Sequence, residues 1–89
     1  MKAIHLVIHG RVQGVFFRKY TFEKANELGL KGMVRNLPSG DVEVFAEGKE
    51  EVLKIFADWC YKGSPASKVE SLESFDVAIV GYEKFSIEK

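Results

Sequence analysis

The nine residues from Gly10 to Arg18, GRVQGVFFR, constrain the fold of this chain more than any other stretch. They follow an alternating apolar segment typical of a strand and precede a segment with helical spacing, so the chain must turn sharply from strand into helix. A helix N-terminus has unpartnered N–H groups and a partial positive charge, which disfavours Arg18 in the first turn unless an anion lies beside it. We therefore predict a loop that binds a tetrahedral oxyanion such as phosphate through backbone amides and this guanidinium.

Hydrophobic periodicity predicts five strands and two helices along the rest of the chain. The expected strands are Lys2–His9, Lys31–Arg35, Asp41–Glu47, Val69–Val77 and Phe85–Glu88, and the expected helices are Phe17–Leu28 and Lys49–Lys62. Gly29 is placed to end the first helix, and Leu37–Gly40 supplies a hairpin turn. The second helix has an apolar stripe of Val52, Ile55, Phe56 and Trp59. Irregular alternation after Val69 predicts an edge strand with a bulge or bend.

The order βαββαβ with a short extra C-terminal strand predicts a ferredoxin-like α/β sandwich, of class α+β. In this fold a mixed sheet carries both helices on one face. Eighty-nine residues form a single domain, 1–89. The fold hosts many activities, so function must be argued from the site.

Charge and composition exclude several classes of partner. Thirteen basic residues balance thirteen acidic ones, so we expect no nucleic-acid partner. No apolar stretch approaches the ~20 residues of a membrane span and no secretory leader is recognisable, so we expect a cytoplasmic protein without membrane contact. Cys60 is the only cysteine and is expected in the core. His5 and His9 lie roughly 13 Å apart along one strand face, so they cannot share a metal ion, and we expect them on the solvent face.

The loop itself excludes three kinds of phosphate chemistry. A Walker loop needs Lys and then Ser or Thr after its last glycine, whereas Val15 and Phe16 follow Gly14. A cysteine phosphatase needs a thiol within the loop, and a dinucleotide fingerprint needs a third glycine. The remaining possibility is a cradle of amides plus Arg18, with no protein nucleophile.

A second motif, Gly32–Gly40, places Asn36 at the exit of a strand that should neighbour the first. The chain has only three side-chain amides, Gln13, Asn26 and Asn36, and two of them fall in these two motifs. An Asn before a turn often binds its own backbone. Beside an anion cradle, Asn36 has the alternative role of fixing an attacking water.

The two motifs, GRVQGVFFR and GMVRNLPSGDVE, resemble the two signatures of the acylphosphatase family, and the similarity continues through Gly63–Ala66 to Phe85–Ile87. The resemblance implies hydrolysis of the anhydride between a carboxylate and phosphate. It assigns phosphate binding to Arg18 and water orientation to Asn36. It also implies a backbone amide cradle formed by Val12, Gln13, Gly14, Val15 and Phe16. Met33, where Trp is common, and Glu88 and Lys89, which replace a terminal Arg-Tyr pair, depart from the family pattern.

This chemistry agrees with what the sequence lacks. A carboxylate can leave unprotonated, so no general acid is needed, and no cluster of ligands for a metal ion is evident. We therefore expect catalysis without metal or other cofactor, by a monomer whose partners are a small acyl phosphate and inorganic phosphate. Arg11, Lys19 and Arg35 are candidates for a positive pocket mouth. His9 is close enough to the loop to influence its pH dependence.

Two other functions are alternatives to hydrolysis. A ferredoxin-like sheet can bind single-stranded RNA, but the strand Asp41–Glu47 carries three carboxylates that would repel it. A non-catalytic anion-binding accessory domain is the other alternative. The presence of both Arg18 and Asn36 argues against it.

Overall fold

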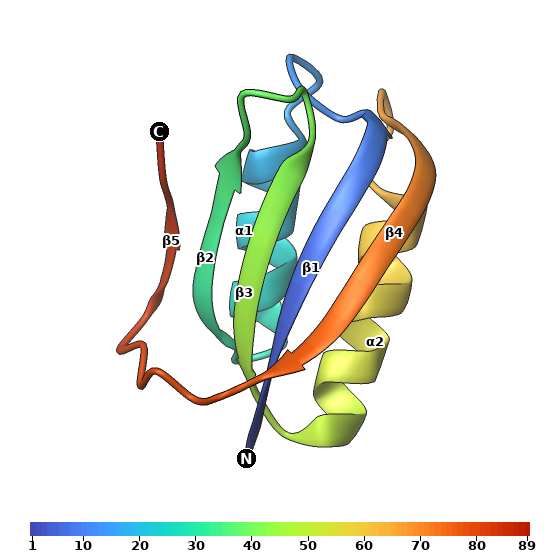
Figure 1. Cartoon of the computed structure of the whole chain (residues 1–89). Helices are drawn as coiled ribbons and strands as arrows, with labels where there is room; N and C mark the ends of the chain where they lie inside the picture. The colour runs from blue at the N-terminus through green and yellow to red at the C-terminus, as the bar shows by residue number, and fades with distance from the viewer.

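Five strands and two helices make up the computed structural model, which describes residues 1–89 (Figure 1). The strands are β1 (Lys2–Arg11), β2 (Lys31–Asn36), β3 (Val42–Gly48), β4 (Lys68–Val77) and β5 (Phe85–Ile87), and the helices are α1 (Phe17–Glu27) and α2 (Glu50–Lys62). Every expected element is present, and no end differs from the expected one by more than two residues. Gly48 ends β3 instead of lying beyond it.

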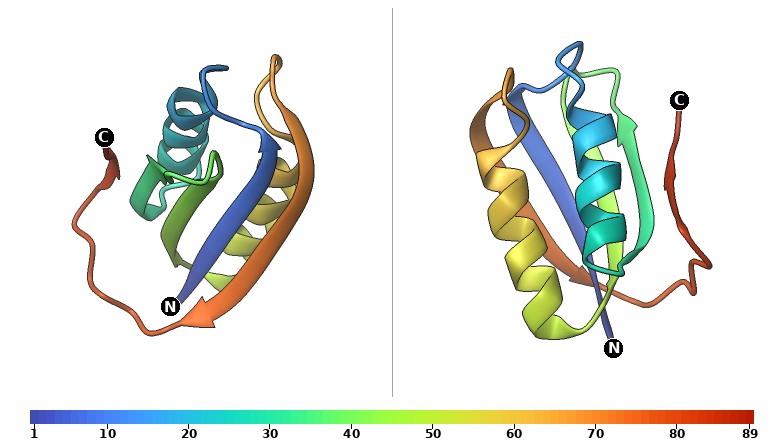
Figure 2. Two further views of the ribbon diagram at one scale, coloured as in Figure 1. Left: turned by 45° about the horizontal axis from the view of Figure 1, so that its top comes forward. Right: turned by 180° about the vertical axis from the view of Figure 1, so that it is seen from behind.

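The sheet has the order β4-β1-β3-β2-β5, and both helices cover one of its faces (Figure 2). Neighbouring strands are antiparallel except β2 and β5, which are parallel. The ferredoxin-like α/β sandwich is therefore confirmed, with β5 as the short additional strand. This order places the C-terminal ends of β1 and β2 at the same end of the sheet as the start of α1.

A bulge at the end of the β1–β4 ladder directs the chain into the first loop. His9 pairs with Ser71 and Gly10 pairs with Val69, so Glu70 of β4 has no partner residue on β1. Gly10 has φ 130°, and a Cβ atom there would lie 2.2 Å from the backbone oxygen of Lys68. Only glycine fits this close approach, and the irregularity predicted for the edge strand is confirmed.

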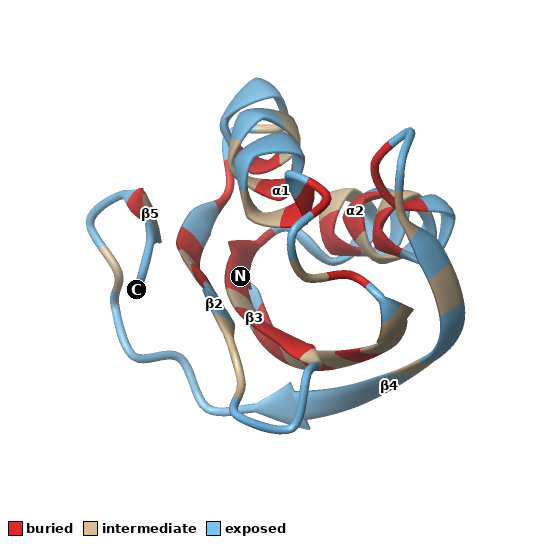
Figure 3. Ribbon diagram, turned by 90° about the horizontal axis from the view of Figure 1, so that it is seen from above, coloured by how far each residue is buried: buried red, intermediate tan, exposed pale blue.

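The hydrophobic core lies between the helices and the inner face of the sheet (Figure 3). Its largest fully buried side chains include Leu6, Ile8, Val34, Val44, Phe17 and Phe56. In α2 the buried residues are Leu53, Phe56 and Cys60, so Cys60 is confirmed as a core residue. The prediction for Ile55 is wrong, because it lies two residues and about 200° around the helix from Leu53 and faces solvent. No helix has the length and apolar character needed to cross a membrane.

The outer face of the sheet is open but its polar groups are paired. His5 stacks on Phe45 with ring centroids 4.3 Å apart and bonds Glu43, which also accepts from Arg35. Both histidines lie on this outer face, as expected, where each is partly covered and contacts a carboxylate. Arg35 therefore lies on the outer face of the sheet. It was expected at the mouth of the pocket, but it does not line the pocket.

A long connection carries the chain from β4 to β5 on the opposite edge of the sheet (Figure 1). The carboxylate of Glu47 on β3 accepts hydrogen bonds from the backbone N–H groups of Val80, Gly81 and Tyr82 in this connection. Glu47 is buried, and this one side chain fastens the middle of the connection to the sheet.

Candidate functional site

The loop Val12–Phe16 joins β1 to α1 in an unusual backbone conformation. Gly14 has φ 73° and Phe16 has φ 61°, while Val15 between them has negative φ. Phe16 is the only non-glycine residue with positive φ. None of the five backbone N–H groups of residues 12–16 donates a hydrogen bond within the chain. Successive amides in such alternating conformations form a concave, electropositive nest that suits an anion.

The turn after α2 contacts the loop through a hydrogen bond. Val15 is buried, and its carbonyl oxygen accepts a 3.0 Å hydrogen bond from the buried Oγ of Ser64. Sequence reasoning gave Ser64 no role and included it in the stretch Gly63–Ala66 that resembles the family. A small hydroxyl residue directly after the Gly63 that ends α2 is the signal that could have suggested a buried contact.

Arg18 lies in the first turn of α1, and its guanidinium reaches the residue that follows β5. Its Nη1 donates to the carbonyl oxygen of Glu88 at 3.0 Å, while the N–H of Glu88 donates to Val34 of β2 at 2.8 Å. The C-terminal segment therefore orients Arg18. Because the contact uses a backbone oxygen, the departures from the family pattern at Glu88 and Lys89 do not remove it.

Asn36 is the last residue of β2 and pairs with Val42 on β3. Its Oδ1 atom is buried and has no hydrogen-bond partner in the chain. Buried side-chain oxygens without a partner are uncommon and often belong to functional sites. Asn36 lines the same pocket as Arg18.

This pocket has a volume of about 320 Å³ and opens beside the N-terminus of α1. Its lining residues are Val12, Gly14, Phe16, Phe17, Arg18, Lys19, Asn36 and Ile87. The lining contains two cations and no carboxylate, so the pocket is positive although the chain as a whole is neutral. Val12, Gly14, Phe16, Arg18 and Asn36 of the predicted set meet here, whereas Gln13 and Val15 do not line the pocket.

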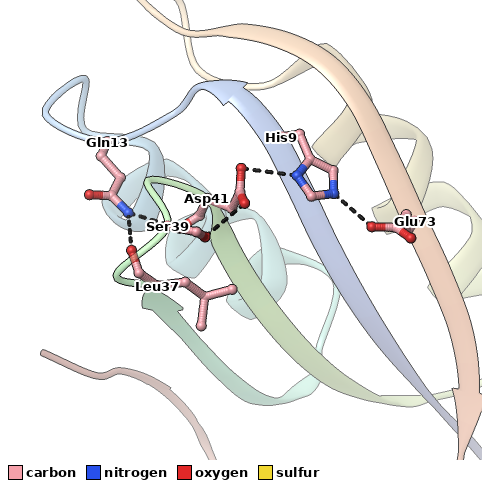
Figure 4. A network of polar contacts seen from close by, with 6 residues as sticks. All are labelled: His9, Gln13, Leu37, Ser39, Asp41 and Glu73. Carbon is pink, nitrogen blue, oxygen red and sulfur yellow. Dashed lines mark hydrogen bonds and ion pairs between the residues drawn. The ribbon is translucent and has the colours of Figure 1, made fainter.

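The side chain of Gln13 turns instead toward the β2–β3 turn (Figure 4). Its Nε2 donates to the carbonyl oxygens of Leu37 and Asp41, both at 2.8 Å. The carboxylate of Asp41 accepts from the hydroxyl of Ser39 and lies 3.0 Å from Nδ1 of His9. The loop and the turn that follows Asn36 are thus joined by side-chain contacts.

Two pKa values in this network are displaced by hydrogen bonds. Glu73 at 2.7 Å and Asp41 at 3.0 Å contact the two ring nitrogens of His9 and raise its pKa, because both carboxylates favour the protonated ring. The hydrogen bond from Ser39 lowers the pKa of Asp41, and His9 lowers it further. Elsewhere, burial raises the pKa of the Cys60 thiol and keeps it neutral. No group of three or more His, Cys, Asp or Glu side chains is arranged to hold a metal ion.

Fold and site together define a ferredoxin-like sandwich whose first loop has free amides suited to an anion, and comparison with known proteins specifies its family. The acylphosphatase family model matches residues 4–87. An acylphosphatase of Methylococcus capsulatus is 43% identical over 88 residues, which cover 98% of this chain and 96% of that one. One from Shewanella amazonensis is 40% identical over 88 residues, covering 98% and 97%. The chain belongs to the acylphosphatase family.

Solved structures agree with this assignment. The acylphosphatase of Bacillus subtilis superposes with a TM-score of 0.97 at 37% identity, and the match covers all of both chains. A structure of HypF from T. kodakarensis matches with a TM-score of 0.84 and 37% identity, covering all of this chain but 12% of that one. The same domain therefore also occurs within much longer proteins.

Proposed function

We propose that this acylphosphatase uses the loop Val12–Phe16 and Arg18 to hold the phosphoryl group of an acyl phosphate, and Asn36 to orient the attacking water. The observation that carries the proposal is the meeting of Arg18 and Asn36, from separate elements, in one positive pocket beside five free amides. Amides and a guanidinium suit the equatorial oxygens, where charge is spread in phosphoryl transfer.

The proposed reaction is an in-line displacement at phosphorus. The water oxygen forms a bond to phosphorus as the bond to the acyl oxygen breaks, and the carboxylate leaves with the electron pair. A phosphate oxygen accepts the proton released by the water, since no side-chain base lines the pocket. A carboxylate is a good enough leaving group to depart without a general acid, so the reaction needs no metal ion.

The position of Asn36 in the pocket lining supports its proposed role. A side-chain amide can form hydrogen bonds with water, and a water held in this way is restricted to one orientation. The accessory-domain alternative is supported only by the occurrence of the same fold within HypF. We further propose that one chain, as a single domain of residues 1–89, forms the complete site and acts as a monomer on small substrates.

The test is hydrolysis of benzoyl phosphate and of p-nitrophenyl phosphate, each with excess chelator. We expect turnover of the first and little of the second, because an ester leaving group usually needs an acid or metal ions. Asn36→Ala should lower kcat on the order of 10²-fold while inorganic phosphate still binds. Asn26→Ala, at an exposed amide on α1, is the matched control and should keep normal kcat.

Arg18 is tested by two substitutions. Arg18→Ala should weaken inorganic phosphate as a competitive inhibitor by roughly 10-fold or more, and Arg18→Lys should restore only part of the affinity, because an ammonium lacks the planar fork.

Turnover that stops when chelator is added would contradict the metal-free mechanism. An unchanged kcat in Asn36→Ala would contradict the role given to that residue.

A further inference from the structure

The side-chain amide of Gln13 makes two contacts that the proposed reaction does not use. The proposed cradle needs only the backbone of this residue, yet its half-buried side chain reaches 24 and 28 positions along the sequence to Leu37 and Asp41 (Figure 4). Both partners are carbonyl oxygens, which can only accept. The amide must therefore present its NH2 group, and both hydrogens are used.

The two carbonyl groups that Gln13 binds also close the turn between β2 and β3. The N–H of Leu37 donates to the carbonyl of Asp41 at 2.8 Å, and the N–H of Gly40 donates to the carbonyl of Leu37 at 3.0 Å. Each carbonyl thus accepts one backbone bond and one bond from Gln13. Leu37 directly follows Asn36, so the amide fixes the peptide beside the residue proposed to hold water.

The turn is fixed from its other side as well. The Asp41 carboxylate contacts the hydroxyl of Ser39 and the ring of His9, and His9 in turn contacts Glu73 on β4. These contacts hold the turn against β1. Among side-chain hydrogen bonds, only the Gln13 amide connects the turn to the anion-binding loop.

We propose that Gln13 is a positioning residue, whose side-chain amide sets the distance and orientation of Asn36 relative to the anion-binding loop. The inference rests on the proposed roles of the loop and Asn36. Its physical basis is that the phosphoryl group is held by one segment and the water by another. Without a direct bond between the segments, the water and phosphorus would sample misaligned positions, and a displacement of about 1 Å can cost up to 10²-fold in rate.

The test is a double-mutant cycle between Gln13→Met and Asn36→Ala. Methionine keeps the length of the side chain but cannot donate. We expect Gln13→Met to lower kcat on the order of 10-fold, with inhibition by inorganic phosphate changed by less than about 3-fold, because binding and water alignment are separate functions. In the Asn36→Ala background the same substitution should have almost no further effect, because the group it positions is gone.

Controls separate this role from a loss of stability. Kinetics are measured well below the unfolding transition of each variant, and Asn26→Ala serves as the amide substitution away from the pocket. Gln13→Glu is the second variant, because it keeps the shape of the side chain, cannot donate when ionised and repels the two carbonyl oxygens. It should reproduce the loss of kcat if Gln13→Met does not fold.

The outcomes are distinct. Equal loss of kcat from Gln13→Met in both backgrounds would overturn the inference about Gln13, as would an unchanged kcat or a loss of phosphate affinity as large as the loss of rate. If Asn36→Ala alone kept normal turnover, the proposed function of Asn36 would fail, and the inference about Gln13 with it. A slow Asn36→Ala with additive effects would overturn only the inference about Gln13.

Discussion

The buried carboxylate of Glu47 is the clearest place to test how the C-terminal segment is held. Its two oxygens accept hydrogen bonds from the N–H groups of Val80, Gly81 and Tyr82. Glu47→Gln removes the charge and turns one oxygen into a donor that faces a backbone donor. A hydrogen bond to a charged group contributes about 1.5–3 kcal/mol, and loss of one bond with weakening of the others predicts a cost of about 2–3 kcal/mol.

Thermal and urea unfolding, followed by circular dichroism, measure this cost. For a domain of this size, each kcal/mol lowers Tm by about 4–8 °C, so we expect Tm to fall by roughly 10–20 °C. Hydrogen exchange at Val80, Gly81 and Tyr82 should accelerate in the same variant. Glu83→Gln, at an exposed carboxylate of the same connection, is the control and should change stability by less than about 0.5 kcal/mol. If both variants unfold alike, the carboxylate does not hold this segment.

Three further predictions concern stability. The buried Oγ1 of Thr21 has no hydrogen-bond partner, so Thr21→Val should stabilise the fold by about 1 kcal/mol, and an unchanged or lower urea midpoint would contradict this. Gly32 has φ 149° and a Cβ atom there would lie 1.8 Å from the carbonyl oxygen of Phe45, so Gly32→Ala should cost about 3 kcal/mol or more, measured by the same unfolding transition. The raised pKa of His9 means that its contribution to stability is complete below its ordinary value of 6.5 and is lost as the pH rises through the raised pKa. His9→Gln should therefore be less stable than the parent at pH 5.5, and the difference should shrink by pH 9; a constant difference would argue against the pairing of this ring with its two carboxylates.

Local patterns in the sequence were sufficient for the architecture. The alternation of Ile4, Leu6 and Ile8 defined the buried face of β1, and Gly29 ended α1 in the left-handed conformation with φ 72° as predicted. These features depend on residues close together in the chain, where side-chain period and backbone preference act directly. The same local reading failed at Ile55, because an apolar residue on a helix does not itself specify which face is covered.

The sequence by itself also predicted that Arg18, Asn36 and the loop Val12–Phe16 lie near one another, since strand order brings their elements together, and five of these residues line one pocket. It could not determine what the remaining polar side chains bind. Ser64 reaches Val15, Arg35 turns to the outer face, and Glu47 holds a connection more than thirty positions away.

The amide of Gln13 joins the loop to the turn beside Asn36 in the same way. A hydrogen-bond partner is chosen by distance and direction in space, and for contacts so far apart in sequence only the assembled tertiary structure supplies these. The sequence thus determined which elements form and where the candidate site lies. The packing of those elements decided which side chains hold the site in place.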